Sequence, residues 1–420
     1  MQIESHQSRI RILLLLAVAL SVAIPARAED WPRWRGPQGN AVSFERELPV
    51  CWSTTQNVRW KTAIPGEGSS SPIVWGDRVF VTSAHEDGTR RAVHAIDRQT
   101  GAVLWTREIA DENPEIASAL TGHAAATPAT DGRHVVAAFG NAGVVCYDFE
   151  GRLLWHVGFG EFESGLGLAT SPILYEDCVI LVCDHDGNRF RTFDSFLIAL
   201  DLATGKASWK TDRPGLFRSW STPILVPVDD RRELVVNAQD ELRGYDPKTG
   251  KLLWHITGMT GWVTPSPVFA DGLIFATSGK DGPTLAVRPG GHGDVTHSHV
   301  VWRQRRGAPY VCSPLVYEDR LYVHTEQGVL TCYRADTGEI LYRQRLDGSF
   351  IASGVAGDGK VYLTNDEGTT FVLRSGDRFE VLARNALGAE TLASPAISGE
   401  AILLRTKAGL YCIEPQDGDW

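Results

Sequence analysis

The sequence predicts an all-β fold, an eight-bladed β-propeller built from four-stranded antiparallel blades. Three observations lead to this prediction. Two short patterns recur along the chain, short strands alternate with tight turns between them, and the last unit lacks a strand that the start of the chain can supply. The composition agrees, because 42 Gly, 21 Pro and 13 Trp in 420 residues suit a fold with many short strands and turns.

The first recurring pattern is a small hydroxyl residue followed by Pro and an apolar run. Its copies are Ser71-Pro72, Thr127-Pro128, Ser171-Pro172, Thr222-Pro223, Ser266-Pro267, Ser313-Pro314 and Ser394-Pro395, with Ser353-Gly354 in place of one copy. Successive copies lie 40 residues apart between Ser313 and Ser353 and 56 apart between Ser71 and Thr127. Units of this length are typical of propeller blades.

The second pattern is Ala-x-Asp-x-x-Thr-Gly-x-x-x-Trp, which reads AIDRQTGAVLW at 95–105 and ALDLATGKASW at 199–209 and recurs at 244–254. Its Asp and Gly predict a turn before the outermost strand. A Trp on that strand can bury ~150–250 Å² against the next blade if its indole N–H finds a partner. We therefore expect the pattern to dock blade to blade through Trp60, Trp105, Trp155, Trp209, Trp254 and Trp302, with turns at Gly101, Gly205 and Gly250.

The first unit illustrates the strands that we expect. SPIVWGDRVFVTSA gives two strands around Gly76-Asp77, RAVHAID gives a third, and residues 102–109 give a fourth. The eighth unit, from Ser394, ends after residues 410–414 without a fourth strand, whereas residues 57–64 form a lone strand that carries Trp60. We expect this N-terminal strand to complete the last blade and close the ring without an exposed edge.

The N-terminus predicts a secretory signal peptide. Arg9 and Arg11 precede an apolar run at 12–24 and then Ala26-Arg27-Ala28, so we expect cleavage after residue 28 and a periplasmic or secreted protein. We expect the rest of the chain to consist of an N-terminal extension at 29–57 and the propeller at 58–420. The run is too short for a transmembrane segment, and the first cysteine is Cys51, so we expect no lipid anchor. Removal of residues 1–28 moves the formal net charge from −10 to −12, which argues against a nucleic-acid partner.

Seven cysteines in an exported chain leave the disulfide state open, and their odd number leaves at least one unpaired within the chain. Three of them have a simpler interpretation as small buried side chains. Cys146, Cys332 and Cys412 occupy the place that Ala95, Ala199 and Gly244 hold in the matching segments.

The second pattern resembles the tryptophan-docking motif of the pyrroloquinoline-quinone (PQQ) propeller repeats, which quinoprotein alcohol dehydrogenases and BamB-like outer-membrane assembly factors share. The resemblance covers residues 58–420. From DWPRWRGP at 30–37 to GPTLAVRP at 282–289, the wider sequence is also similar to the exported PQQ-like repeat proteins of planctomycete-type bacteria. The resemblance implies the eight-bladed fold and two functional classes, a binding protein and an oxidoreductase.

Two absences decide which class we expect. The resemblance implies that an enzyme of this kind holds its quinone against a disulfide of adjacent cysteines, yet the sequence has neither a Cys-Cys pair nor a C-x-x-C-H haem motif. We therefore expect a monomeric, non-catalytic binding or scaffold protein without cofactor or metal, whose partner is a protein or peptide of the cell envelope. The assembly-factor resemblance implies a role in outer-membrane protein assembly. The alternative is an alcohol or sugar dehydrogenase that uses PQQ and calcium.

The candidate binding residues precede the innermost strands, where the chain should line one mouth of the central channel. They are Glu67, His123, Arg218, Trp220, Trp262, Tyr310, Phe350 and Glu390. Trp220 and Trp262 come from consecutive units, so we expect them to face each other across a slot beside Arg218. Such a site suits a planar anionic ligand or a peptide carboxylate. The alternative is that these aromatic side chains only plug the channel.

Two further patterns are weaker. DHDGN at 184–188 resembles the start of a calcium loop, but Arg189 and Ser195 stand where Gly and Glu belong, so a strand-connecting turn is the alternative. His292, His297 and His299 lie in GGHGDVTHSH, where they suit a transition metal if the last two share a strand face, or a polar loop. The sequence contains no G-x-S-x-G, H-E-x-x-H or Walker motif.

Overall fold

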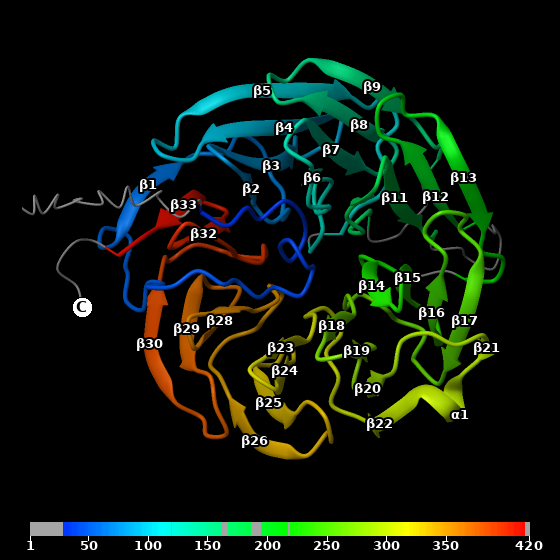
Figure 1. Cartoon of the computed structure of the whole chain (residues 1–420). Helices are drawn as coiled ribbons and strands as arrows, with labels where there is room; N and C mark the ends of the chain where they lie inside the picture. The colour runs from blue at the N-terminus through cyan, green and yellow to red at the C-terminus, as the bar shows by residue number, and fades with distance from the viewer. Residues whose placement is uncertain (1–27, 119, 162–166, 186–194, 217–218, 416–420) are drawn as a thin grey trace, which may run out of the picture.

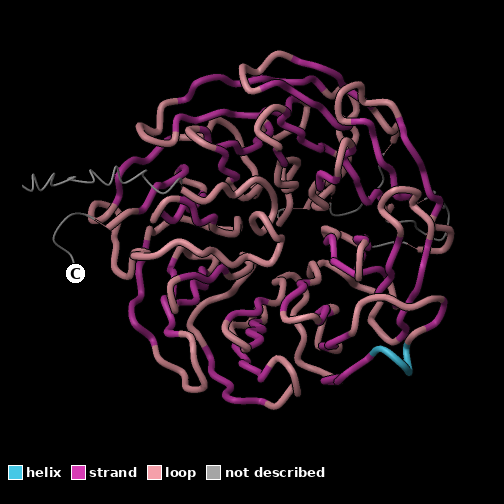
Figure 2. The backbone as a smooth tube through the Cα atoms, in the orientation of Figure 1, coloured by secondary structure: helices cyan, strands magenta, loops and turns pink. Residues whose placement is uncertain are grey.

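The computed structural model describes residues 28–118, 120–161, 167–185, 195–216 and 219–415. Within these residues, eight antiparallel sheets stand in a ring (Figure 1), which confirms the predicted eight-bladed propeller. The helix among them is the single turn α1 (Thr296–His299), and Figure 2 shows that strands and loops make up the rest. The described residues contain no helix with the length and apolarity needed to span a membrane.

Each blade runs from an inner strand near the axis to an outer strand at the rim. Blade 1 consists of β2 (Ile73–Trp75), β3 (Arg78–Ala84), β4 (Arg90–Asp97) and β5 (Val103–Ala110). Blade 2 consists of β6 (Ala129–Thr130), β7 (His134–Phe139), β8 (Gly143–Asp148) and β9 (Leu153–Val157). Blade 3 consists of β10 (Ile173–Tyr175), β11 (Cys178–Cys183), β12 (Phe196–Asp201) and β13 (Ala207–Asp212). Blade 4 consists of β14 (Ile224–Val228), β15 (Arg231–Ala238), β16 (Glu241–Tyr245) and β17 (Leu252–Thr257), and β21 (Gly293–Asp294) pairs with the outer side of β17.

The second half of the ring repeats this order. Blades 5 and 6 consist of β18 (Val268–Ala270), β19 (Leu273–Thr277), β20 (Thr284–Val287) and β22 (Val300–Gln304), and of β23 (Leu315–Tyr317), β24 (Arg320–His324), β25 (Val329–Arg334) and β26 (Ile340–Arg345). Blade 7 consists of β27 (Val355–Gly357), β28 (Lys360–Thr364), β29 (Thr369–Arg374) and β30 (Val381–Ala386). Blade 8 consists of β31 (Ala396–Ser398), β32 (Ala401–Thr406), β33 (Gly409–Ile413) and β1 (Val58–Thr62).

The ring closes as expected, because the N-terminal strand β1 is the outer strand of the last blade. It pairs antiparallel with β33, and Trp60 lies opposite Cys412. Both chain ends are thus tied into one sheet, and the outer edge that β33 would otherwise expose is paired.

The docking tryptophans occupy one register position in successive blades. Trp105 lies opposite Ala95, Trp155 opposite Cys146 and Trp209 opposite Ala199. A small residue is needed there because the neighbouring indole occupies the space. Cys146, Cys332 and Cys412 are accordingly buried free thiols, and burial raises the pKa of Cys146 and of Cys332 to about 12.

These indoles reach the turn of the next blade. Trp105 Nε1 donates to the carbonyl oxygen of Phe149 (2.9 Å), and its ring lies against Gly151, whose φ is +79°. The same hydrogen bond joins Trp60 to Arg98, Trp155 to Leu202, Trp209 to Pro247 and Trp302 to Ala335. Gly101, Gly205 and Gly250 face the rings of Trp60, Trp155 and Trp209, so each glycine leaves room for the tryptophan of the preceding blade.

Trp254 departs from this arrangement. Its Nε1 donates to the Glu233 carboxylate of its own blade (2.7 Å), and its ring lies over Gly244. The cause is the insert that carries β21, which pairs with β17 where the next blade's turn would otherwise dock. Trp254 therefore packs in one hydrophobic cluster with Leu285 and Val287 of blade 5, as expected for blade docking, but its indole N–H finds a partner in its own blade and not on the turn of the next blade.

The segment of residues 28–57 crosses one face of the ring to its centre and returns to β1, as the blue trace in Figure 1 shows. Trp31 forms a β-bridge with Val74 of blade 1, and Val42 forms one with Ala356 of blade 7. Farther along, Trp52 stacks on Tyr362 of blade 7 with ring centroids 6.4 Å apart. Blade 7 has Ala383 where most other blades carry the docking Trp, so Trp52 brings an aromatic ring to a blade without one at that position.

Candidate functional site

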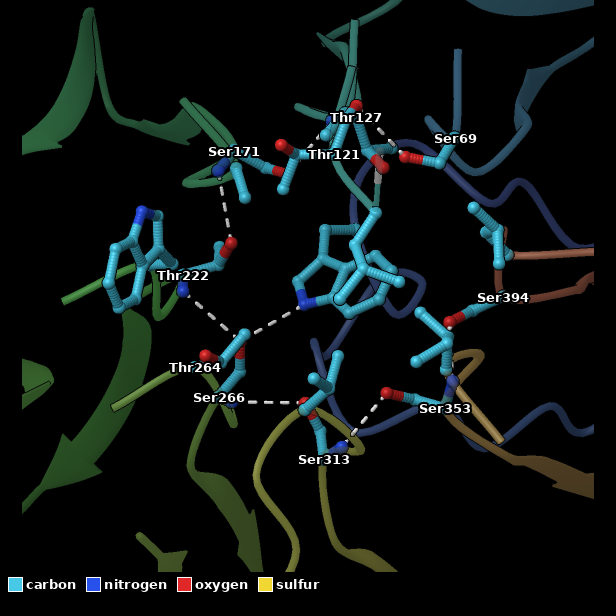
Figure 3. A pocket seen from close by; sticks show the side chains of 18 of the residues that line it. Ser69, Thr121, Thr127, Ser171, Thr222, Thr264, Ser266, Ser313, Ser353 and Ser394 are labelled. Carbon is cyan, nitrogen blue, oxygen red and sulfur yellow. Dashed lines mark hydrogen bonds between the residues drawn. The ribbon is translucent and has the colours of Figure 1, made fainter. Parts of the chain in front are cut away.

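A belt of hydroxyl groups lines the axis of the propeller, and it is built from the first recurring sequence pattern. The backbone N–H of each pattern residue from Ser71 to Ser353 donates to the side-chain oxygen of the corresponding residue in the next blade. Among the described residues, such bonds of 2.9 to 3.1 Å run in order through Ser71, Thr127, Ser171, Thr222, Ser266, Ser313, Ser353 and Ser394. Figure 3 shows most of these side chains arranged around the axis. The repeated hydroxyl therefore has a structural role, since it joins neighbouring blades at the centre.

An indole from the N-terminal segment closes one side of the belt. Trp34 lines the central cavity, and its Nε1 donates to Ser266 Oγ (3.2 Å). Trp34 was not among the predicted site residues because it precedes the repeats and matches neither pattern. Trp34 thus lies at the centre of the channel, and Trp220 and Tyr310, two of the aromatic residues expected at the mouth, line the same cavity.

The cavity above Trp34 has a volume of about 120 Å³ and opens at the mouth of the channel. Seven of the belt residues contribute to its wall, all except Ser71. Its other described lining residues are Trp34, Ser69, Ser118, Leu120, Thr121, Ala125, Ala169, Trp220, Thr264, Tyr310, Val311, Ile351 and Leu392. Within this described lining there is no carboxylate, imidazole, amine, guanidinium or thiol, so the surface that it offers is hydroxyl-bearing and apolar.

Trp220 and Trp262 lie together at the mouth, but no slot separates them. Their rings stack with centroids 6.2 Å apart and planes 19° apart. A planar ligand between two rings needs planes about 7 Å apart, twice the usual contact distance. The expectation of a slot is therefore wrong, because each ring already occupies the place that a ligand would take. Arg218, expected beside it, lies outside the described residues.

The stack continues outward to a cation. Tyr310 meets Trp262 edge to face, and Lys280 Nζ lies 4.4 Å from the Trp262 centroid and 4.7 Å from that of Tyr310. An ammonium group over two ring faces is held by the ring quadrupoles. Lys280 could not be predicted from the sequence patterns because it lies in a turn within blade 5 and not in a segment that precedes a Ser-Pro or Thr-Pro pair.

The remaining mouth residues separate into other surroundings. Glu67 and Glu390 line a second cavity between blades 8 and 1, where each lies within 4 Å of Lys407 Nζ. Phe350 is buried in the core and packs on Phe371. The expected single site at the mouth thus divides, because neighbouring entry segments fold over different blades.

His123 belongs to a buried ionic cluster beneath the segment that links blades 1 and 2. Arg91 donates to Asp111 and to Glu115, each at 3.0 Å, and also to the carbonyl oxygen of His123. His123 Nδ1 lies 3.6 Å from Glu115 Oε1. This cluster holds in place the segment whose Ser118, Leu120 and Thr121 line the cavity.

The residues of the two weaker sequence patterns lie in surroundings other than those of a metal site. Asp184 pairs with Arg213 at 3.0 Å, and residues 186–188 of the supposed calcium loop lie outside the described residues. His297 and His299 lie in the helical turn α1, so the expectation that they share a strand face is wrong, and His299 Nδ1 interacts with Ser298 Oγ. No three His, Cys, Asp or Glu side chains of the described residues gather closely enough to hold a metal ion.

Comparison with known proteins identifies the family. The family model described as outer membrane protein assembly factor BamB matches residues 30–119, 89–282, 194–315 and 294–420, which together span 30–420. The chain belongs to the BamB family. The BamB of Yersinia pestis is 21% identical over 343 residues, which cover 78% of this chain and 81% of that protein.

The chain is also similar to enzymes. A polyvinylalcohol dehydrogenase from Pseudomonas sp. is 25% identical over 374 residues, which cover 75% of this chain and 54% of the enzyme, so the chain spans about half the length of that relative. The quinohemoprotein alcohol dehydrogenase from Comamonas testosteroni has a TM-score of 0.68 at 11% identity, covering 92% of this chain and 81% of that one, which is a likeness of fold.

The described lining of the central cavity does not fit the quinone of such enzymes. PQQ is a three-ring tricarboxylate, so it needs cations beside it, and a calcium ion with it needs carboxylate or amide oxygens. The described lining of the central cavity of this BamB-family chain supplies neither a cation nor a carboxylate or amide side chain. Its volume of about 120 Å³ is near that of an engineered cavity of about 150 Å³ that accepts benzene, a single ring.

Proposed function

We propose that this chain is an exported, non-catalytic propeller that binds a protein partner in the cell envelope at the channel mouth, in the service of outer-membrane protein assembly. The observation that carries the proposal is the central cavity, whose described lining is hydroxyl-bearing and apolar and whose floor is Trp34. Catalysis of alcohol oxidation needs a base near the reacting hydroxyl. A cavity without such a group suits the uptake of a side chain and not a reaction.

The size and surroundings of the cavity support a protein ligand. A volume of about 120 Å³ accepts one apolar side chain, and anchors of this kind in a pocket dominate many protein interfaces. Leu120 lines the cavity and is 45% exposed, and Ile116 on the same segment is 79% exposed. Apolar side chains that stay exposed beside a pocket favour burial against a partner.

The envelope location is supported by two independent features. The residues at 1–28 have the pattern of a signal peptide, although they fall almost entirely outside the described part of the chain. The family is named for outer-membrane protein assembly, and its member from Yersinia pestis matches over most of both chains. A partner in the outer-membrane assembly machinery therefore fits both the location and the family.

A charge placed in the cavity wall tests the proposal in cells. In a strain that depends on this chain for normal outer-membrane protein levels, Leu120→Asp should lower those levels toward those of the deletion strain, because a desolvated carboxylate opposes docking of an apolar anchor. The matched control is Leu104→Asp on the rim strand β5, where Leu104 is 48% exposed. Equal levels in the two variants, at equal protein abundance, would contradict docking at the mouth.

The alternative function is a quinone-dependent oxidoreductase, which the polyvinylalcohol dehydrogenase relative favours. It is tested with purified protein, PQQ and calcium. The proposal predicts no saturable change in the quinone spectrum and no reduction of an artificial dye with alcohols or polyvinyl alcohol. Saturable binding together with substrate-dependent dye reduction would replace the proposal by the alternative.

A further inference from the structure

The seam between blades 8 and 1 is the place where the hydroxyl belt is interrupted. Within the described residues, the bond that would join Ser394 to Ser71 is missing, and Ser71 Oγ is buried without a hydrogen-bond partner. A side chain takes over the connection. Arg405 of β32 donates through Nη1 to Ser70 O (3.1 Å) and to Ser70 Oγ (2.7 Å). A guanidinium group therefore links the first and last blades where the other blades use a neutral hydroxyl.

The charge of Arg405 is buried and uncompensated. Only 4% of the residue is exposed, and no described carboxylate lies within 4.0 Å of its nitrogens. Burial lowers the pKa of its guanidinium to about 10, which leaves it charged near neutral pH. A buried cation without a neighbouring anion is costly, because hydrogen bonds to a neutral serine replace only part of its lost hydration. An anion that entered beside Arg405 would remove that cost.

There is room for such an anion. Arg405 lines the cavity between blades 8 and 1, which has a volume of about 110 Å³ and shares Ser69, Leu120, Thr121 and Leu392 with the central cavity. Its Nη2 lies 2.9 Å from where a Cβ on Gly68 would stand, and Gly68 also lines the cavity. Glycine at 68 thus leaves the cavity side of the guanidinium uncovered.

The other described charged side chains of the cavity are one lysine between two glutamates. Lys407 Nζ lies 3.9 Å from Glu67 and 3.7 Å from Glu390, and all three side chains are more than half exposed. They form a solvated rim. Arg405 is the one described charged side chain of this cavity that has no oppositely charged group within 4.0 Å. Ile64, Leu120 and Leu392 supply apolar wall beside it.

We infer that the seam cavity is a carboxylate-binding site, in which Arg405 takes the carboxylate and the apolar wall takes an adjoining aliphatic group. A guanidinium presents paired N–H donors that match the two oxygens of a carboxylate. Nη1 is bonded to Ser70, and Nη2, which lies beside Gly68 of the cavity wall, supplies the donors for the ligand. The carboxylate belongs to a small organic acid or to the C-terminus of a peptide. This site goes beyond the function proposed for the channel mouth and does not depend on it.

A matched pair of ligands tests the inference on the purified mature chain. N-acetyl-leucine carries a carboxylate, whereas N-acetyl-leucinamide has the same shape without the charge. Calorimetric titration should show saturable binding of the acid, with the amide roughly tenfold weaker or worse, because a charge-assisted bond is replaced by a neutral one. Equal affinity for acid and amide, or no binding of the acid, would overturn the inference, and neither result requires a variant.

Two substitutions locate the site. Arg405→Lys keeps the charge but loses the planar fork, so the affinity for N-acetyl-leucine should fall roughly tenfold. The control is Arg35→Lys, because Arg35 is also a buried arginine without a described carboxylate partner but does not line this cavity. Equal affinities of the two folded variants would contradict the assignment. The peptide acetyl-Ala-Ala-Leu, as free acid and as amide, then distinguishes the two sources of the carboxylate. If the free-acid peptide binds more tightly than N-acetyl-leucine, the ligand is a peptide C-terminus, and if the two acids bind equally, it is a small organic acid.

Discussion

The indole nitrogen of Trp34 donates a hydrogen bond to the hydroxyl of Ser266 across 3.2 Å, and this bond ties the N-terminal segment to the hydroxyl belt of the propeller. Trp34 thereby becomes the floor of the central cavity. The bond joins residues 232 positions apart, so the segment before the repeats acts as part of the propeller's interior. The cavity at the mouth exists in its present depth because this one side chain closes it.

Trp34→Ala should therefore both destabilise the fold and deepen the cavity. Loss of an aromatic side chain from a largely buried place costs about 3 kcal/mol, whereas Trp34→Phe, which keeps a ring and loses the hydrogen bond, should cost about 1 kcal/mol. Urea unfolding of the two variants measures both values. A Trp34→Ala variant as stable as the wild type would contradict the role of Trp34 as a packed floor.

The contact between each docking indole and the glycine turn of the next blade can be tested by substitution. Gly151 has φ +79°, and a Cβ there would lie 2.8 Å from the ring of Trp105, so Gly151→Ala should suffer both backbone strain and a clash with the indole. Gly160 has φ +83° with nothing within 4 Å, so Gly160→Ala suffers the strain alone. Thermal unfolding should show a loss larger by about 1–3 kcal/mol for Gly151→Ala. Matching losses would show that the indole does not press on that turn.

The belt predicts an asymmetry between two serines of the same sequence pattern. Ser313 Oγ accepts the backbone N–H of Ser266, so Ser313→Ala leaves a buried donor unpaired and should cost about 1–3 kcal/mol. Ser71 Oγ accepts no such bond from the described residues, so Ser71→Ala should cost less than about 1 kcal/mol. Urea denaturation of both variants decides between a continuous belt and the interrupted one.

Two buried histidines predict a pH dependence of stability. Burial lowers the pKa of His94 and of His324 to about 4 in the folded chain, against about 6.5 when unfolded. Between these values the unfolded state binds protons that the native state does not, so stability falls as pH drops from about 6.5 to about 4, by about 3 kcal/mol for each residue. Above that window neither group contributes. Urea unfolding across this range should show a flatter profile for the double variant His94→Gln, His324→Gln; parallel profiles would contradict burial of neutral imidazoles.

The fold was predictable from the sequence because its information is repeated. Most blades carry the same turn and the same indole, so a decayed copy such as the one in blade 7 is recognised by comparison with its neighbours. Closure by β1 followed in the same way, from a strand missing at one end and present at the other. The structure of Trp254 was not predictable, because the insert that displaces its docking turn occurs once and has no counterpart to compare.

The site was less predictable for a related reason. Entry segments were expected to converge on one mouth, but they differ in length and fold over different blades, so Glu67 and Glu390 reach the seam while His123 joins a buried cluster. Trp34 belongs to no repeat, and Arg405 looks like an ordinary strand residue. Their positions depend on contacts between residues more than 200 apart in the chain, which spacing along the sequence does not encode.

The central claim, that the channel mouth receives a protein partner, is tested most directly by site-specific photo-crosslinking in living cells. A photoreactive amino acid at Leu120, in the wall of the cavity, is compared with the same amino acid at Leu104 on the rim. The account predicts a discrete crosslink to a component of the outer-membrane assembly machinery from position 120 and none from position 104. A crosslink from the rim alone, or none from either position while the chain remains functional, would contradict it.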